Sequence, residues 1–136
     1  MLTLKSIKKL VAALAVMAMA WGILPPAMAQ DLTGPTQVVN TYVASLLSGD
    51  TGQLLALMGE RMQQKNRHVA LSPDTYTEFL KEHYAGVQTV VETVEPAGDR
   101  VNARVRFDYP NSYSSLIEFT LDQVDGQWKV VSENEL

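Results

Sequence analysis

Three side chains in this sequence are candidates for acid–base chemistry: Tyr42, His83 and Glu92. A glutamate or histidine in a pocket can act as a general base, and a tyrosine can donate a hydrogen bond to a substrate oxygen. Such a set would suit a small isomerase, dehydratase or hydrolase. Each residue also has a structural interpretation, which we prefer. Tyr42 then belongs to the core with its hydroxyl satisfied, His83 lies at the core edge, and Glu92 faces solvent.

Glu92 is the candidate whose orientation the sequence leaves open. Its strand, residues 87–95, has apolar residues at both parities. A four-residue connection over 96–99 would pair Glu95 with Arg100 and point Glu92 inward, where it could act as a base. A three-residue connection would pair Pro96 with Arg100 and turn Glu92 outward.

A ligand pocket, if the fold contains one, is the other expected functional feature. We predict that it is lined by Tyr42, Asn66, Tyr84, Glu92, Tyr109 and Trp128. No metal site or cofactor is predicted, because the chain has no cysteine and its two histidines lie 15 residues apart without a nearby acidic cluster. The sequence also has no glycine-rich phosphate loop and no nucleophile elbow.

A four-stranded antiparallel meander over residues 87–132 would position these side chains. Apolar residues alternate with polar ones along residues 100–109 and 117–122, which is typical of strands buried on one face. A short last strand surrounds Trp128 and Val130. We therefore expect the odd-numbered residues to face the core: Val101, Ala103, Val105, Phe107, Tyr109, Ile117, Phe119 and Leu121.

The turns predict how these strands pair. Asp125-Gly126 is typical of a two-residue type I′ hairpin, which sets Leu121 opposite Val130. For the preceding hairpin we expect Phe107 to face Ile117 and Val105 to face Phe119. Both pairings bring apolar residues together on one side and opposite charges together on the other.

Three helices are predicted before the sheet. The first begins at Thr33-Gly34-Pro35 and ends at Gly49. The second begins at Asp50 or Thr51, continues through Met62 and frays over 63–67. The third begins at Ser72-Pro73-Asp74, ends at Gly86, and carries an apolar stripe formed by Tyr76, Phe79, Leu80, His83 and Tyr84. Helices followed by strands indicate an α+β fold, with the helices on one face of the sheet.

Two stretches resemble the nuclear transport factor 2-like superfamily: Tyr42-Val43-Ala44-Ser45-Leu46-Leu47-Ser48-Gly49-Asp50 and Asp125-Gly126-Gln127-Trp128-Lys129-Val130. The resemblance covers nearly all of residues 30–136. It implies a curved sheet that wraps around the long helix as a cone, often with a pocket at the open end. Because this fold serves isomerases, dehydratases, hydrolases, ligand-binding domains and dimerisation modules, it does not define a function.

The steroid isomerase branch provides the most specific comparison. The resemblance places its oxyanion-hole tyrosine at Tyr42, but its catalytic base falls on Asn66, whose amide cannot accept a proton at neutral pH. Its second acid should project from the strand before Asp125, which offers only Phe119, Leu121 and Gln123. We therefore reject steroid isomerase chemistry.

Residues 1–29 have the pattern of an export signal. Lys5, Lys8 and Lys9 precede an apolar stretch over 10–24, and Ala27-Met28-Ala29 predicts cleavage before Gln30. An uncleaved anchor is the alternative, although the apolar stretch is short for a membrane span. We expect a periplasmic or secreted protein whose single domain is residues 30–136 and does not contact the membrane.

Charge argues against nucleic acid as a partner. All 15 acidic residues follow Ala29 and three of the 11 basic residues precede it, which gives residues 30–136 a net charge of −7. Arg100, Arg104 and Arg106 line the outer face of one strand. There they could hold an anionic ligand or partner, or pair with Glu118 and Asp122, which we prefer.

Three hypotheses for function follow. We prefer an exported, non-catalytic module that binds a small molecule or a protein partner in the cone or on the sheet. The first alternative is a small enzyme that uses Glu92 or His83 with Tyr42. The second is a structural homodimer formed through the polar outer face of the sheet, which sedimentation of the protein would test.

Overall fold

The computed structural model describes residues 31–136, which form five helices and one antiparallel sheet. The predicted export signal lies outside the described residues. The elements are α2 (Thr33–Ser48), α3 (Thr51–Leu57), α4 (Glu60–Lys65), α5 (Arg67–Leu71), α6 (Pro73–His83), β1 (Gln88–Ala97), β2 (Arg100–Asp108), β3 (Ser114–Val124) and β4 (Gln127–Glu135). The strands pair in sequence order, so the predicted α+β meander is confirmed.

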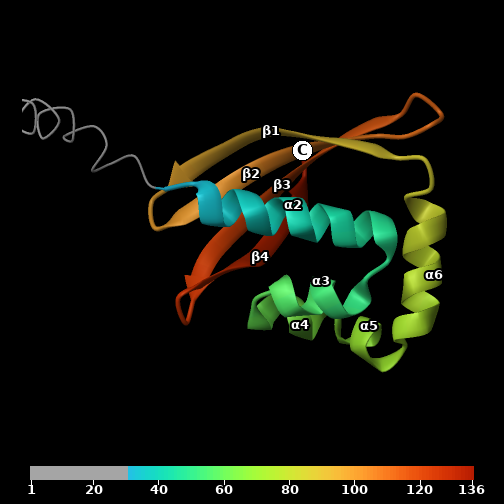
Figure 1. Ribbon diagram of the computed structural model, residues 1–136, viewed down its shortest axis with the longest axis horizontal. Helices are drawn as coiled ribbons and strands as arrows, with labels where there is room; N and C mark the ends of the chain where they lie inside the picture. Colours follow the sequence, from blue (N-terminus) through green and yellow to red (C-terminus); the bar gives the residue numbers. More distant parts are fainter. Residues whose placement is uncertain (1–30) are drawn as a thin grey trace, which may run out of the picture. The chain divides into compact units, whose positions relative to one another are not determined.

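The long helix α2 crosses one face of the curved sheet, and the shorter helices continue from its C-terminal end (Figure 1). Its inner stripe, Val39, Tyr42, Val43 and Leu46, is buried. The helix ends where predicted, because Gly49 adopts the left-handed conformation with φ 75°. None of the helices in residues 31–136 combines the length and hydropathy that a membrane span requires.

The core lies between α2 and the inner face of the sheet. As the alternation predicts, Val101, Ala103, Val105 and Phe107 of β2 are buried, and so are Phe119 and Leu121 of β3. Burial on one face only is what fixes the strand orientation, because turning the strand over would expose all of these side chains.

The prediction of one continuous second helix is wrong, because three short helices take its place. The chain is extended at Met58, which pairs with Val130 of β4, and Gly59 donates its N–H to the Val130 carbonyl at 2.8 Å. This contact with the sheet interrupts the helix between α3 and α4. Helix α5 then follows over residues for which only a frayed end and a loop were expected.

The β3–β4 hairpin has the predicted pairing. Leu121 lies opposite Val130, and Asp125 and Gly126 both have positive φ, as a type I′ turn requires. The β2–β3 register is wrong by two residues, because Phe107 lies opposite Ser115 rather than Ile117. A tighter turn causes the shift: Tyr109 donates its N–H to the Tyr113 carbonyl at 2.8 Å and extends the ladder. A shift of two keeps every side chain on its predicted face.

The connection between β1 and β2 is shorter than either predicted loop. Ala97 pairs with Arg100, which leaves only Gly98 and Asp99 between the strands. The register then shifts between Val91 and Thr93, so Glu92 is the extra residue of a bulge. Both Val91 and Val94 pack against the core on either side of it, which explains why the sequence showed apolar residues at both parities.

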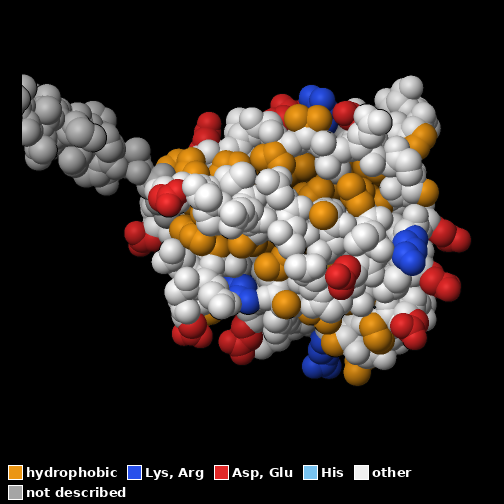
Figure 2. Space-filling view, in the orientation of Figure 1, with side chains coloured by type: hydrophobic (Ala, Val, Ile, Leu, Met, Phe, Trp, Pro, Cys, Tyr) orange, Lys and Arg blue, Asp and Glu red, His pale blue; other side chains and the backbone are white. Residues whose placement is uncertain are grey.

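Charged side chains on the outer face of the sheet form ion pairs with one another. Arg100 contacts Asp122 at 3.3 Å, and Arg104 contacts Glu118 at 3.1 Å. Arg106 contacts both Asp108 at 3.1 Å and Glu92 at 3.3 Å. All three arginines therefore form ion pairs within the sheet, although exposed pairs of this kind stabilise a fold only slightly. Figure 2 shows further acidic side chains around the edge of the face that carries α2.

Candidate functional site

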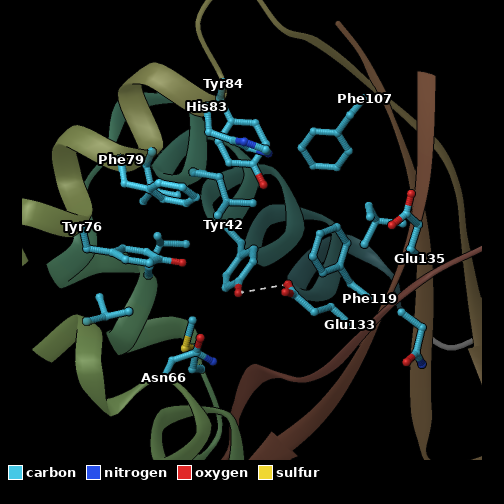
Figure 3. Close-up of a pocket in the computed structure, with 17 residues that line it drawn as sticks. Tyr42, Asn66, Tyr76, Phe79, His83, Tyr84, Phe107, Phe119, Glu133 and Glu135 are labelled. Atoms are coloured by element: carbon cyan, nitrogen blue, oxygen red, sulfur yellow. Dashed lines mark hydrogen bonds between the residues drawn. The ribbon is translucent and has the colours of Figure 1, made fainter. Parts of the chain in front are cut away.

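A cavity of about 280 Å³ lies between the helices and the C-terminal half of the sheet. Figure 3 shows α6 side chains on one side, β3 and β4 side chains on the other, and Tyr42 between them. The lining combines apolar and aromatic side chains with several polar groups. Its residues are Tyr42, Leu46, Leu54, Met58, Asn66, Val69, Tyr76, Phe79, Leu80, His83, Tyr84, Phe107, Ile117, Phe119, Glu133, Asn134 and Glu135. Concave, largely apolar cavities with a few convergent polar groups are the usual form of small-molecule sites.

Tyr42 and Glu133 form the polar centre of the cavity. Tyr42 lies on the inner stripe of α2, and its ring packs edge-to-face on Phe119, with 5.4 Å between ring centroids. Its hydroxyl donates a long hydrogen bond of 3.5 Å to Oε2 of Glu133 (Figure 3). Burial, followed by the charge of Glu133, raises the pKa of Tyr42, so the phenol stays protonated as a hydrogen-bond donor.

Glu133 is exposed as a residue, yet it lines the cavity and its carboxylate lies beside the Tyr42 hydroxyl. Partial desolvation by the surrounding protein raises its pKa, while the hydrogen bond from Tyr42 opposes the shift. A carboxylate with a raised pKa in a cleft is a candidate functional group.

A ladder of rings on α6 forms the opposite wall. Residues at helical spacing bring Tyr76, Phe79, His83 and Tyr84 to one side of the helix. The rings of Phe79 and His83 stack at 5.5 Å, and those of His83 and Tyr84 meet edge-on at 4.7 Å. Phe79 remains 52% exposed whereas Leu80 is buried, so the predicted apolar stripe contributes to the core and also borders the cavity. Burial, followed by neighbouring Tyr109 and Glu133, raises the pKa of Tyr84.

The structure brings together four of the residues proposed from sequence. Tyr42, Asn66, His83 and Tyr84 all line the cavity. Asn66 Nδ2 donates to the Met62 carbonyl at 2.8 Å, so part of its amide caps its own helix turn.

The other three proposed residues lie elsewhere. Tyr109 lines an adjoining hollow, which shares His83, Tyr84 and Glu135 with the cavity. Glu92 does not line the cavity: the bulge places it on the outer face beside Arg106. Trp128 packs at the other end of α2, where a Cβ on Gly34 would lie 2.9 Å from its ring.

Sequence reasoning missed Glu133. The last strand was predicted to be short, but β4 continues to Glu135. Its register shifts because Leu121 pairs with Val130 and Thr120 pairs with Ser132, which leaves Val131 as the extra residue. A bulge reverses which face later residues occupy, so Glu133 lies opposite Phe119 and points inward. The acidic residues of the C-terminal Ser-Glu-Asn-Glu stretch gave no signal of this reversal.

The cavity has no built metal centre. His, Asp and Glu side chains of residues 31–136 do not gather in groups of three or more at ligand distance. Glu135 Oε1 accepts hydrogen bonds from Tyr113 and Ser115, both at 3.1 Å, so it is held toward the adjoining hollow. The polar chemistry of the cavity therefore centres on Glu133 and the tyrosine hydroxyls.

Replacing Glu133 with glutamine is expected to stabilise the fold at neutral pH. Because the folded-state pKa is raised, the unfolded chain ionises first as the pH increases, and the folded state loses stability above the ordinary glutamate range. Glutamine keeps an acceptor for Tyr42 but removes the charge. Since water in the cavity screens that charge, the gain should be a few tenths of a kcal/mol, or roughly 2 °C in Tm.

Urea unfolding at pH 4 and pH 7 would test this expectation. The stability of Glu133→Gln relative to the original protein should rise between the two values. Glu95→Gln, which removes an equal charge from an exposed position of β1, serves as the control. A lower relative stability of Glu133→Gln at pH 7 would show that the carboxylate is stabilised by its surroundings.

Comparison with solved structures identifies the fold. The chain is similar to an NTF2-like protein of unknown function from Shewanella baltica OS155, with TM-score 0.57 and 13% identity over 79% of this chain and 94% of that one. It is also similar to an NTF2-like protein of unknown function from Methylobacillus flagellatus KT, with TM-score 0.56 and 19% identity over 77% and 90% of the two chains.

A third NTF2-like protein of unknown function, from Silicibacter pomeroyi DSS-3, matches with TM-score 0.56 and 16% identity over 80% of this chain and 97% of that one. Neither the family models nor the curated proteins that were searched gave a match. At these identities the likeness is one of fold. The helical layer, the curved meander and the three structural matches together show that this chain has the NTF2-like fold.

Proposed function

We propose that the protein binds a small organic molecule in the cavity and does not transform it. The observation that carries the proposal is the cavity itself, which combines aromatic walls with a single carboxylate–phenol pair at its centre. Its size, about 280 Å³, is near the lower limit for ligand sites, which favours a ligand of one or two rings or a compact aliphatic group.

The arrangement of the polar groups supports binding over catalysis. An acid–base site needs its base and its oxyanion donor free to contact different atoms of the substrate. Here the hydroxyl of Tyr42 is directed at Glu133 itself, so the two groups occupy one side as a pair. The pair can fix the orientation of a ligand, but it provides no second hydrogen-bond donor for an oxyanion.

A proton-transfer enzyme is the second candidate, and one observation favours it. The raised pKa of Glu133, which results mainly from desolvation, is what a general base requires. In that case Tyr76 or Tyr84 on the α6 wall would have to supply the hydrogen bond to the substrate. A ligand that binds the original protein without any product forming would count against this candidate, whereas turnover that Tyr76→Phe or Tyr84→Phe abolishes would support it.

Filling the cavity is expected to weaken ligand binding strongly. Ile117 is partly buried and lines the cavity, so Ile117→Phe would place a ring in the ligand space. Val90 is 42% exposed and pairs with Arg106 on the outer face, which makes Val90→Phe a matched control. A library of small fragments, screened by ligand-observed NMR, should give hits that Val90→Phe retains and Ile117→Phe weakens by about tenfold or more.

The screen also defines how the proposal would fail. Fragments that bind both variants equally would place their site outside the cavity. Absence of any hit against the original protein would contradict ligand binding altogether.

A further inference from the structure

The two sides of the cavity differ in chemistry, and together they favour a positively charged ligand over a negatively charged one. Rings of Tyr76, Phe79 and Tyr84 form the helical side, and the carboxylate of Glu133 lies across from them on β4 (Figure 3). The lining contains no lysine or arginine among the described residues. A positive group inside the cavity would therefore face aromatic rings and a negative charge but no lysine or arginine, and His83 is the one basic side chain of the lining.

The carboxylate and the rings act on the same space. After burial, the charge of Glu133 is the next cause that raises the pKa of Tyr76, and it also contributes to the raised pKa of Tyr84. The field of the carboxylate therefore extends across the cavity to the α6 wall. An anionic ligand would meet this field unfavourably, whereas a cation would be stabilised by it.

The aromatic rings also favour a positively charged ligand. The π faces of tyrosine and phenylalanine carry partial negative charge and attract cations within about 6 Å of the ring centre. This attraction is greatest for weakly hydrated organic cations, which lose little solvation on entering an aromatic site. A metal ion would not be held in this way, because ring faces do not replace its oxygen ligands.

We infer that the cavity binds a small organic cation, with its ammonium group between Glu133 and the rings of α6. The inference rests on the proposed ligand-binding function and specifies the chemical class of the ligand. Methylated or otherwise hindered ammonium groups suit the aromatic wall best, because they are weakly hydrated and aromatic rings attract them, while Glu133 supplies the opposite charge.

Lys65 is the basic residue that could compete with such a ligand. It lies on α4 and lines a hollow next to the cavity together with Glu133. Within residues 31–136, however, no ion pair joins Lys65 to Glu133, since the salt bridges of this region all lie on the outer face of the sheet. The charge of Glu133 is therefore left available to a ligand.

Choline and 3,3-dimethylbutan-1-ol provide a direct test, because they have nearly the same shape and differ in charge. Titration of the purified protein, followed by NMR or calorimetry, should show choline binding about tenfold more tightly than the neutral alcohol. Equal affinity for the two would overturn the cation inference and leave ligand binding intact. If neither compound binds, the cation inference fails, and the fragment screen decides separately whether the proposed ligand-binding function fails as well.

Two pairs of variants locate the effect. Glu133→Gln should weaken choline binding about tenfold and leave the alcohol unchanged, whereas Glu118→Gln, on the outer face beside Arg104, should change choline affinity by less than about twofold. Tyr84→Phe keeps a ring and should retain choline binding, and Tyr84→Leu should lose several-fold. Equal effects of Glu133→Gln and Glu118→Gln would show that only net charge matters and would overturn the proposed site.

Discussion

Phe119→Ala is expected to lower the free energy of unfolding by about 3–5 kcal/mol. Phe119 is only 1% exposed, and its ring packs against Tyr42 across the interface between β3 and α2. Removing the ring takes away buried apolar surface and leaves a void that the rigid sheet cannot close. The void would also merge with the cavity, because Phe119 is part of its wall.

Urea unfolding of Phe119→Ala and Thr120→Ala would measure this effect. Thr120 is the next residue of β3, but it faces outward and donates a hydrogen bond of 3.1 Å to Asn102. Its loss should lower stability by roughly 0.5–1 kcal/mol. Since a domain of this size has a total stability of about 5–15 kcal/mol, Phe119→Ala should remain folded in water but only marginally. Similar losses for the two variants would contradict the assigned faces of β3.

The sheet could be predicted from the sequence because the alternation of apolar and polar residues recurs in more than one strand. Every second residue of β2 from Val101 to Phe107 is apolar, and the pattern continues through Phe119 and Leu121. An error of two residues in the β2–β3 register, such as the one found here, changes no side chain from one face to the other. A prediction of which residues face the core therefore survives an error of two residues in the length of a turn.

Bulges are what the alternation could not predict. Each adds one residue to one strand, and the cause lies in the tertiary fit of the sheet rather than in the residues at the bulge. Glu92 sits in one of them and points outward, away from the cavity. Val131 forms the other and turns Glu133 inward. The bulges thus decide which carboxylate reaches the cavity, Glu133 rather than Glu92, and the alternation alone could not predict this.

The helical half of the site was more accessible to sequence reasoning. The sequence predicts Tyr42 in the core and Tyr84 and His83 on the apolar stripe of the last helix, and all three line the cavity. Helical spacing assigns these residues to a face without depending on register. It does not say whether that face packs tightly or borders a cavity. That distinction depends on how closely α6 packs against the sheet, which helical spacing alone does not determine.

Gly49→Ala is expected to destabilise the protein by about 2–3 kcal/mol, for two reasons that add. Gly49 ends α2 with φ 75°, a conformation that disfavours any residue with a Cβ by roughly 1–2 kcal/mol. An added Cβ would also lie 2.9 Å from the carbonyl oxygen of Thr77, which belongs to the backbone of α6 and cannot rotate away. Relief of this contact would require α6 to move away from α2.

That movement would reach the site, because the same junction positions the ring wall. Thr77 Oγ1 donates a hydrogen bond of 2.8 Å to the Gly49 carbonyl, which joins the end of α2 to the helix that carries Tyr76 and Tyr84. Gly49→Ala should therefore weaken ligand binding as well as lower the free energy of unfolding. Choline titration and urea unfolding of the same variant would measure the two effects together.

Gly52→Ala is the matched control for this prediction. The substitution is chemically the same three residues later, but Gly52 lies in the first turn of α3, and an added Cβ would meet only the Asp50 side chain at 3.7 Å. Alanine favours helix over glycine, so this variant should be as stable as the original protein or more stable by about 0.5 kcal/mol. A loss at Gly52 equal to that at Gly49 would mean that the α2–α6 junction does not control the position of α6.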